Sequence, residues 1–286
     1  MKYSWAWLFA VSLVVLGCTK SGSSSAPSDS GLLSLHATDA PFARGIVTDA
    51  RVQVTKISIH SDGGANSGFT TLYQGPPIDL DLLHLQNGVT QALVQATLPA
   101  GDYRQLRLVV SDASLTLNNG NVYSTAAGNL HLASQQTSGF KLFVEPPVHV
   151  SSAVAQSLLL DFDLGKMFKP VPANDALNAA SYKFHPVIHV SNQSTTGELR
   201  GLVTIDDGTG AQVGVAGATV YVLLPGELDP NNSVATSGSL SNGQYTILGL
   251  DPGAYDVLAI EGSRQGRVNG KTITVGNATM ADISIQ

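Results

Sequence analysis

Two aspartates spaced two residues apart, Asp161 and Asp163, are the first side chains in this sequence that could do chemistry. They stand in SLLLDFDL, whose alternation is typical of a β-strand with Leu160 and Phe162 facing the core, so both carboxylates should share one face with about 6.6 Å between their Cα atoms. Carboxylates this close can bind calcium or divide acid and base roles as in a glycosidase. With Asp39, they form a set of candidate calcium ligands, and the alternative is that all three cap turns or contact solvent.

The histidines suggest a metal site less well. His185 and His189 have the i, i+4 spacing of helical zinc sites, but Pro186 argues against a helix, and on a strand the two rings would lie about 13 Å apart. The sequence also lacks G-x-S-x-G, H-E-x-x-H, C-x-x-C and a phosphate-binding loop. We therefore predict no catalytic residue and no cofactor, with calcium as the one metal that remains a candidate. The protein is expected not to be an enzyme, and a carboxylate-based hydrolase using Asp161 and Asp163 is the less favoured alternative.

The single cysteine, Cys18, indicates a covalent modification. An apolar run of about 13 residues from Trp5 to Gly17 precedes it, which is shorter than the roughly 20 residues that a membrane-spanning helix needs. The run ends in VLGC, which resembles the bacterial lipobox. The resemblance implies a lipoprotein signal peptide at 1–17 and an acylated, palmitate-bearing Cys18 that holds the protein on a lipid bilayer. Thr19 in place of Asp implies, under the enterobacterial sorting scheme, a lipid-anchored protein of the cell envelope at the outer membrane.

Composition favours a β-rich, loop-rich protein of more than one domain. The chain has 286 residues, of which 43% are hydrophobic and 13% charged, with 29 Gly and 13 Pro. The formal net charge of −6 and the absence of a basic cluster exclude nucleic acid as an expected partner. Residues 18–30 are a Ser-rich stalk too polar to bury a core. The polar stretch SNQSTTG separates a domain at 31–192 from a second domain at 198–286.

Alternating segments, such as RVQVTKISIH and RQLRLVV, indicate half-buried strands throughout both domains. In the first of these the apolar parity shifts, which predicts a bulge near Thr55 and Lys56. The Asn-Gly in SLTLNNGNVYS predicts a hairpin. Residues 81–88 and 176–182 are the best helical windows, and both are short.

Two turns in different domains look alike, LPAGDY and LDPGAY. In each, a glycine reverses the chain and a tyrosine follows two residues later. We predict positive φ at Gly101 and Gly253 and a structural rather than functional role for both turns.

The C-terminal domain resembles the carboxypeptidase regulatory-like domain, a transthyretin-like β-sandwich of a carbohydrate-binding-like fold group. The positions that carry the resemblance are Gly201, Val203, Gly217, Ala218, Val220, Val222, Gly243, Tyr245, Ile247, Gly249, Leu250, Gly253 and Tyr255. Tyr245 and Tyr255 are expected to pack inside the sandwich. The fold group implies glycan binding only by analogy.

The N-terminal domain resembles a bacterial lipoprotein family of unknown function. The matching residues are Gly31, Thr38 to Pro41, Ile78 to Leu80, Leu98 to Gly101, Tyr103, Arg107, Leu108 and Leu158 to Asp163. This family implies no activity.

These observations together predict an all-β protein with two β-sandwich domains in tandem after a signal peptide and a flexible stalk. The function that fits best is a membrane-anchored, non-enzymatic binding or scaffolding module of the cell envelope. Its expected partners are the bilayer through acylated Cys18 and a glycan or an envelope protein. The alternative is a carbohydrate-binding surface protein that acts through the C-terminal domain.

Overall fold

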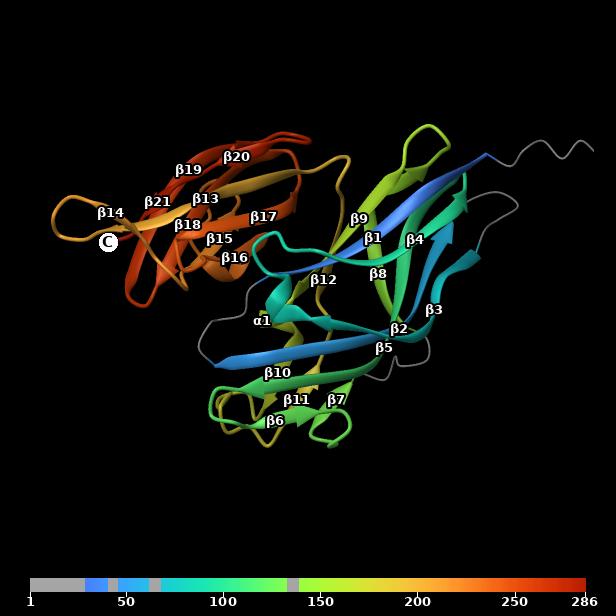
Figure 1. Cartoon of the computed structure of the whole chain (residues 1–286), viewed down its shortest axis with the longest axis horizontal. Helices are drawn as coiled ribbons and strands as arrows, with labels where there is room; N and C mark the ends of the chain where they lie inside the picture. The colour runs from blue at the N-terminus through green and yellow to red at the C-terminus, as the bar shows by residue number, and fades with distance from the viewer. Residues whose placement is uncertain (1–28, 41–45, 62–67, 133–138) are drawn as a thin grey trace, which may run out of the picture.

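The computed structural model describes residues 29–40, 46–61, 68–132 and 139–286. Figure 1 shows these residues as two groups of strands side by side, an N-terminal unit in blue to yellow-green and a C-terminal unit in orange and red. The secondary-structure elements of the described residues are strands apart from three short helical turns, so the all-β prediction is confirmed. Each unit has its own hydrophobic core. The predicted signal peptide, Cys18 and most of the stalk lie outside the described residues. Within the described ranges, no helix is long and apolar enough to cross a membrane.

One sheet of the N-terminal unit contains the first strand of the chain at its centre. Its order is β12 (Ile188–Asn192), β9 (Gln156–Asp163), β1 (Ser30–Ala40) and β4 (Gln91–Pro99). Strand β1 runs antiparallel to β4 and parallel to β9. Leu160 and Phe162 of β9 are fully buried in the core, as the alternation predicts.

A second sheet packs across this core. It contains β3 (Gly68–Asp81), β2 (Val47–Ser61), β5 (Gly101–Leu117) and β6 (Val122–Ser124), with β8 (Phe140–Val150) also paired to β5. The register of β2 shifts between Val54 and Lys56 against both β3 and β5, which confirms the predicted bulge. The Asn-Gly hairpin is also confirmed, since β5 and β6 pair antiparallel across Gly120 at φ 85°.

The N-terminal unit also contains a small third sheet, which occupies part of a segment predicted to be helical. It contains β10 (Phe168–Val171), β11 (Ser181–Phe184) and β7 (Leu130–Leu132). The prediction of a helix at 176–182 is wrong, because Asn178 N donates to Asp175 Oδ1 at 3.0 Å in a turn and Ser181 already starts β11. The other window, 81–88, forms only the 3₁₀ helix η2 (Leu82–Leu85), and the short helix α1 (Leu164–Met167) follows β9.

The C-terminal unit is a sandwich of two sheets. One contains β14 (Gln212–Gly214), β13 (Gly197–Asp206) and β17 (Gln244–Leu250), with β20 (Ala278–Met280) and β21 (Ile283–Ser284) parallel to β13. The other contains β16 (Ala235–Gly238), β15 (Thr219–Leu223), β18 (Gly253–Glu261) and β19 (Arg264–Ile273), with the 3₁₀ helix η3 (Pro230–Asn232) between β15 and β16. Inward-facing valines such as Val203, Val220 and Val257 are fully buried between the sheets.

The two similar turns carry the chain from one sheet to the other in their respective units. The turn at Pro99–Gly101 joins β4 to β5, and the turn at Asp251–Gly253 joins β17 to β18. Tyr103 Oη donates to Pro99 O at 2.9 Å and Tyr255 Oη donates to Asp251 O at 3.0 Å. Each turn is therefore closed by the same type of hydrogen bond, from a tyrosine hydroxyl to the carbonyl oxygen four residues earlier. Gly101 has φ 153° as predicted. The prediction is wrong for Gly253, which lacks a positive φ although it too is the first residue of its strand, where it pairs with Ile273.

Candidate binding site at the junction of the two units

The segment between the two units is fixed by hydrogen bonds to both of them. Strand β12 ends at Asn192 and β13 begins at Gly197. Gln193 N donates to Ser157 O of the N-terminal unit at 2.9 Å, and Gly276 N of the C-terminal unit donates to Thr196 O at 2.9 Å. The segment that the sequence marks as a boundary is therefore part of a packed junction.

The outer face of the first sheet packs directly against β17. Leu159 and Ser191 form a cross-strand pair on this face, and Leu159 is fully buried although it points away from the N-terminal core. A Cβ placed on Gly249 would lie 2.3 Å from Ser191 Oγ and 3.2 Å from Leu159 Cδ2. This contact explains why β9 contains three successive leucines, because a strand that is buried on both faces has a continuous run of apolar residues.

A turn after η2 makes a second contact between the units. Thr38 Oγ1 donates to the carbonyl oxygens of Leu85 and Val89 at 3.0 Å each, which holds the turn in place. At its tip Asn87 has φ 59°, and its Oδ1 accepts a hydrogen bond from Ser237 Oγ at 3.2 Å. Figure 1 shows this turn, in teal, reaching the C-terminal strands.

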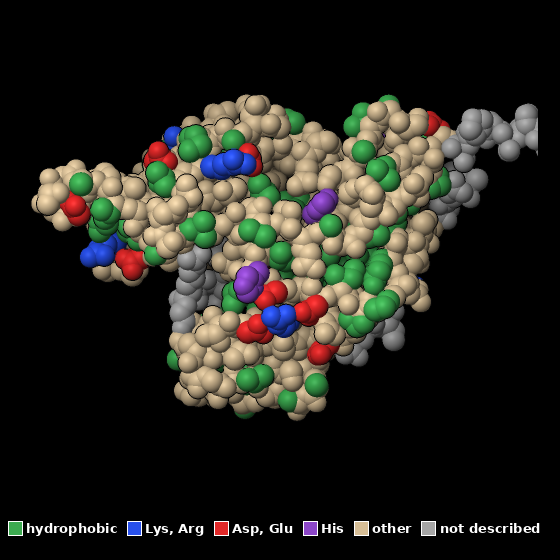
Figure 2. Space-filling view, in the orientation of Figure 1, with side chains coloured by type: hydrophobic (Ala, Val, Ile, Leu, Met, Phe, Trp, Pro, Cys, Tyr) green, Lys and Arg blue, Asp and Glu red, His purple; other side chains and the backbone are tan. Residues whose placement is uncertain are grey.

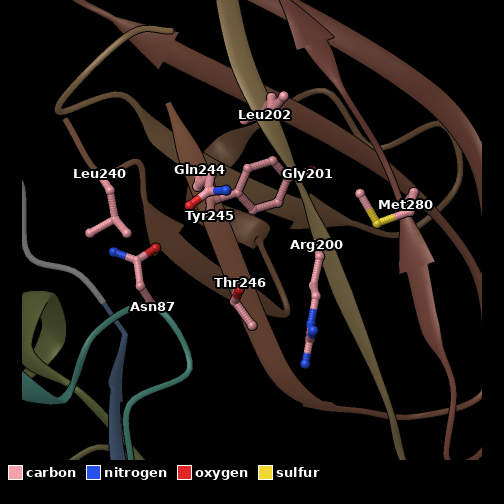
Figure 3. A pocket seen from close by; sticks show the side chains of 9 residues that line it. All are labelled: Asn87, Arg200, Gly201, Leu202, Leu240, Gln244, Tyr245, Thr246 and Met280. Atoms are coloured by element: carbon pink, nitrogen blue, oxygen red, sulfur yellow. The ribbon is translucent and has the colours of Figure 1, made fainter. Parts of the chain in front are cut away.

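Beside this contact is a pocket of about 550 Å³. Figure 3 shows Asn87 approaching from the N-terminal unit, while the other eight residues come from the C-terminal unit. These eight residues are Arg200, Gly201, Leu202, Leu240, Gln244, Tyr245, Thr246 and Met280. The apolar part is accessible to solvent, with Leu202 at 36%, Leu240 at 45% and Met280 at 58% exposed.

The polar groups of the pocket are suited to binding rather than to proton transfer. Arg200, its one charged side chain, pairs with Glu198 at 2.8 Å. Tyr245 is 2% exposed and donates its hydroxyl hydrogen bond to Ala281 O. Burial raises the pKa of Tyr245 far above its ordinary value, so this phenol is not available as a base. What remains is a set of amide and guanidinium donors beside an apolar surface.

The predicted carboxylate pair is on one strand face but lines two different clefts. Asp161 lines a cleft of about 260 Å³ between the units, together with His189, its cross-strand neighbour, and Asp251. Asp163 lines another cleft, where its Oδ1 accepts from Lys166 N at 3.1 Å and its Oδ2 pairs with Lys166 Nζ at 2.8 Å. The structure therefore does not bring the two carboxylates into one cleft as a hydrolase would require.

Asp39 is a buried carboxyl group at the end of β1. It is 5% exposed, Gln86 Nε2 donates to its Oδ2 at 3.4 Å, and its Oδ1 has no hydrogen-bond partner. Burial, followed by repulsion from Asp161, raises the pKa of Asp39 well above its ordinary value. In the described part of the chain, no three His, Cys, Asp or Glu side chains are arranged to hold a metal ion. Calcium binding by Asp39, Asp161 and Asp163 stays a prediction.

Other carboxylates have structural partners. Asp79 and Asp81 contact Arg51 at 2.7 and 2.8 Å. Asp256 pairs with Arg267 at 2.8 Å, and hydrogen bonds from Gly226 N and from Arg267 lower the pKa of Asp256. Charged side chains are sparse on the face shown in Figure 2, where acidic ones gather around a basic one.

Sequence reasoning missed the residues of the junction pocket. The available signal was ELRGLV, in which Arg200 and Leu202 alternate with buried Leu199 and Val203 and so share the outer face of β13. The approach of Asn87 depends on how the two units meet, and no local pattern contains that information.

The fold and this site define an all-β protein of two packed units with a solvent-accessible pocket at their junction. Residues 30–186 match the family described as Domain of unknown function (DUF4382), and the chain belongs to this family. This agrees with the predicted family of unknown function for the N-terminal unit. No match was found among curated proteins.

Several solved structures align along most of the chain at low similarity. The minor pilin GBS52 of Streptococcus agalactiae is 15% identical with a TM-score of 0.25, and the alignment covers 88% of this chain and 94% of that one. The shaft pilin SpaA of Lactobacillus rhamnosus GG is 9% identical with a TM-score of 0.24, covering 90% and 97%. The major pilin BcpA of Bacillus cereus is 9% identical with a TM-score of 0.22, covering 90% and 70%. At these TM-scores the alignments carry no argument about this chain.

Proposed function

We propose that this protein is a lipid-anchored, non-enzymatic module of the cell envelope that binds an envelope protein in the junction pocket. The observation that carries the proposal is the pocket itself, which combines solvent-accessible apolar side chains with amide and guanidinium donors and contains no acid–base pair. Pockets with this composition bind ligands through burial of apolar surface and a few directed hydrogen bonds.

A protein segment fits this pocket better than a sugar. The three exposed apolar side chains are Leu202, Leu240 and Met280, and a flexible thioether adapts to varied apolar partners. The pocket presents no exposed aromatic ring, because Tyr245 is buried. Tyr255, which lines the cleft beside Asp161, is only 8% exposed. The glycan alternative for the C-terminal domain therefore has less support than an envelope protein.

The anchor is proposed from the sequence, since Cys18 lies outside the described residues. Two or three acyl chains on Cys18 would hold the protein stably, because a single chain gives only marginal membrane affinity. Thr19 supports an outer-membrane location. We also propose that 198–286 form a carboxypeptidase regulatory-like domain, which the two-sheet sandwich of the C-terminal unit supports.

Site-specific photo-crosslinking in cells tests the pocket. A photoreactive benzophenone residue in place of Met280 should give a discrete crosslinked product with one protein. The same residue in place of Val122, which is 55% exposed on the N-terminal unit, is the matched control. Adding Arg200→Gln to the Met280 crosslinker should weaken that product. Equal products from both positions, or none from position 280, would contradict the proposal, and a crosslinked glycan would support the carbohydrate alternative instead.

A further inference from the structure

The outer face of the second sheet in the N-terminal unit carries aromatic and cationic side chains in neighbouring rows. Antiparallel pairing aligns Phe69 of β3, His60 of β2, Gln105 of β5 and Phe143 of β8 across the sheet. Residues paired in this way project from the same side. Phe143 is 63% exposed and Phe69 is 38% exposed. The row therefore places two accessible rings three strand spacings apart, about 14 Å.

The next row places two cations beside these rings. Arg107 of β5 pairs with Ser58 of β2 on one side and with Lys141 of β8 on the other. The Arg107 guanidinium lies over the Phe69 ring, with Cζ 3.8 Å from the ring centroid. His60 contacts the same ring edge-on at a centroid distance of 4.8 Å. A ring held from two sides has little freedom to move, so Phe69 is ordered before any ligand arrives.

Among the residues that the structure describes, no carboxylate forms an ion pair with Arg107. Elsewhere in the described chain Arg51, Arg200, Arg264 and Arg267 each pair with Asp or Glu within 3.5 Å. In the same described ranges neither Arg107 nor Lys141 forms such a pair, and Arg107 Nε lacks a hydrogen-bond partner. A protein of formal net charge −6 thus presents a local cationic row beside exposed rings.

We propose that this face, defined by Phe69, His60, Arg107, Lys141 and Phe143, binds an anionic polysaccharide. The ring faces would pack against the C–H faces of the pyranose units, because the aromatic face is the electron-rich side of the ring. Arg107 and Lys141 would contact carboxylates of uronate units, Arg107 through its planar fork of donors. The residues stand in rows across adjacent strands, which suits a linear polymer lying across the sheet. This surface is separate from the junction pocket and does not depend on its partner.

Two other occupants fit the charges less well. Single-stranded nucleic acid also uses aromatic platforms beside cations, but it carries one phosphate charge per nucleotide, and the acidic protein would repel it outside this small face. A second copy of the chain in a two-fold contact would place like cations opposite one another. A polymer of moderate anionic charge with apolar ring faces avoids both conflicts.

Affinity electrophoresis of the full chain with Cys18→Ser tests the proposal. Polygalacturonate in the gel should retard the protein, and neutral dextran should not. Phe143→Ala should lower the association constant obtained from the retardation about threefold to tenfold, as expected for one lost ring contact. Lys141→Gln should weaken it about twofold to fivefold and reduce its salt dependence. Both side chains are exposed, so the fold should tolerate both changes, which unchanged circular dichroism would verify.

The matched control is Lys183→Gln, an exposed cation on β11 of the third sheet. It should leave the retardation unchanged. The absence of retardation by polygalacturonate, or an equal loss in Lys183→Gln, would overturn the proposal. So would tighter binding of an oligothymidylate probe than of polygalacturonate, because it would identify the face as a nucleic-acid site.

Discussion

The packing of β17 against β9 predicts an unusual cost for adding one methyl group to Gly249. This glycine has φ 71°, where a side chain costs about 1 kcal/mol or more. Its Cβ would also meet Ser191 Oγ at 2.3 Å and Leu159 Cδ2 at 3.2 Å. Overpacking of this kind costs about 1 to 3 kcal/mol. Gly249→Ala should therefore destabilise the protein by about 2 to 4 kcal/mol in total.

Gly262→Ala separates the two contributions. Gly262 lies between β18 and β19 at φ 58°, and a Cβ there would meet nothing within 4 Å. Its substitution should cost only the backbone strain, about 1 kcal/mol. Ser191→Ala removes the clashing oxygen, so the double variant with Gly249→Ala should recover about 1 kcal/mol through coupling between the two sites.

Urea unfolding of the full chain, followed by circular dichroism, measures these differences. The free energies of unfolding can be compared only if all variants have the same m-value, which is the slope of the free energy of unfolding against urea concentration. If Gly249→Ala and Gly262→Ala cost the same, and Ser191→Ala shows no coupling with Gly249→Ala, then β17 does not pack on β9 in solution. That result would refute the description of the junction.

Three further predictions concern the anchor, the buried acid and the tyrosine turns. Cys18→Ser should abolish incorporation of labelled palmitate and move the protein out of the detergent phase, and unchanged partitioning would contradict the lipoprotein proposal. Burial raises the folded-state pKa of Asp39 above its unfolded value of about 3.9, so its contribution to stability is fully present below that unfolded value and is lost as pH rises through the folded pKa. Urea unfolding between pH 4 and 8 should therefore show Asp39→Asn gaining stability relative to the wild type as pH increases, and a constant difference would contradict this assignment. Tyr103→Phe and Tyr255→Phe should each lower the free energy of unfolding by about 1 kcal/mol through the lost bond to the carbonyl four residues earlier, and a change below 0.3 kcal/mol, measured by thermal melting, would show that these bonds contribute little.

The features that could be predicted from the sequence are those determined by residues close together in the chain. The bulge of β2 followed from a parity shift within ten residues, and the hairpin around Gly120 from an Asn-Gly pair. Gly101 and Gly253 stand in similar local sequences, yet only Gly101 has a positive φ. Both glycines start a strand and have a cross-strand partner, Val150 for Gly101 and Ile273 for Gly253, so the local sequence does not determine their φ angles.

The remaining errors arise from contacts between residues that are distant in the sequence. Residues 176–182 are locally compatible with a helix, but Ser181 and Tyr182 belong to β11, where Tyr182 pairs with Leu130 of β7 and with Pro170 of β10, and residues 176–180 form bends before that strand. Tertiary pairing overrides a weak local propensity. For the site, the sequence placed Asp161 and Asp163 on one face correctly, but the position of the second unit over that face decides which cleft each carboxylate lines.

The place of β1 between β4 and β9 also determines when the N-terminal unit can fold. Its parallel partner, from Gln156 to Asp163, is more than a hundred residues later in the chain. The sheet therefore cannot close until nearly the whole unit has left the ribosome, and pairing over such sequence distances is slow. A chain that is exported through a membrane must stay unfolded during transit. For the exported lipoprotein proposed above, late closure of β1 would favour the unfolded state that transit needs, and a circular permutant that makes β1 and β9 adjacent in sequence should fold faster and be exported less efficiently.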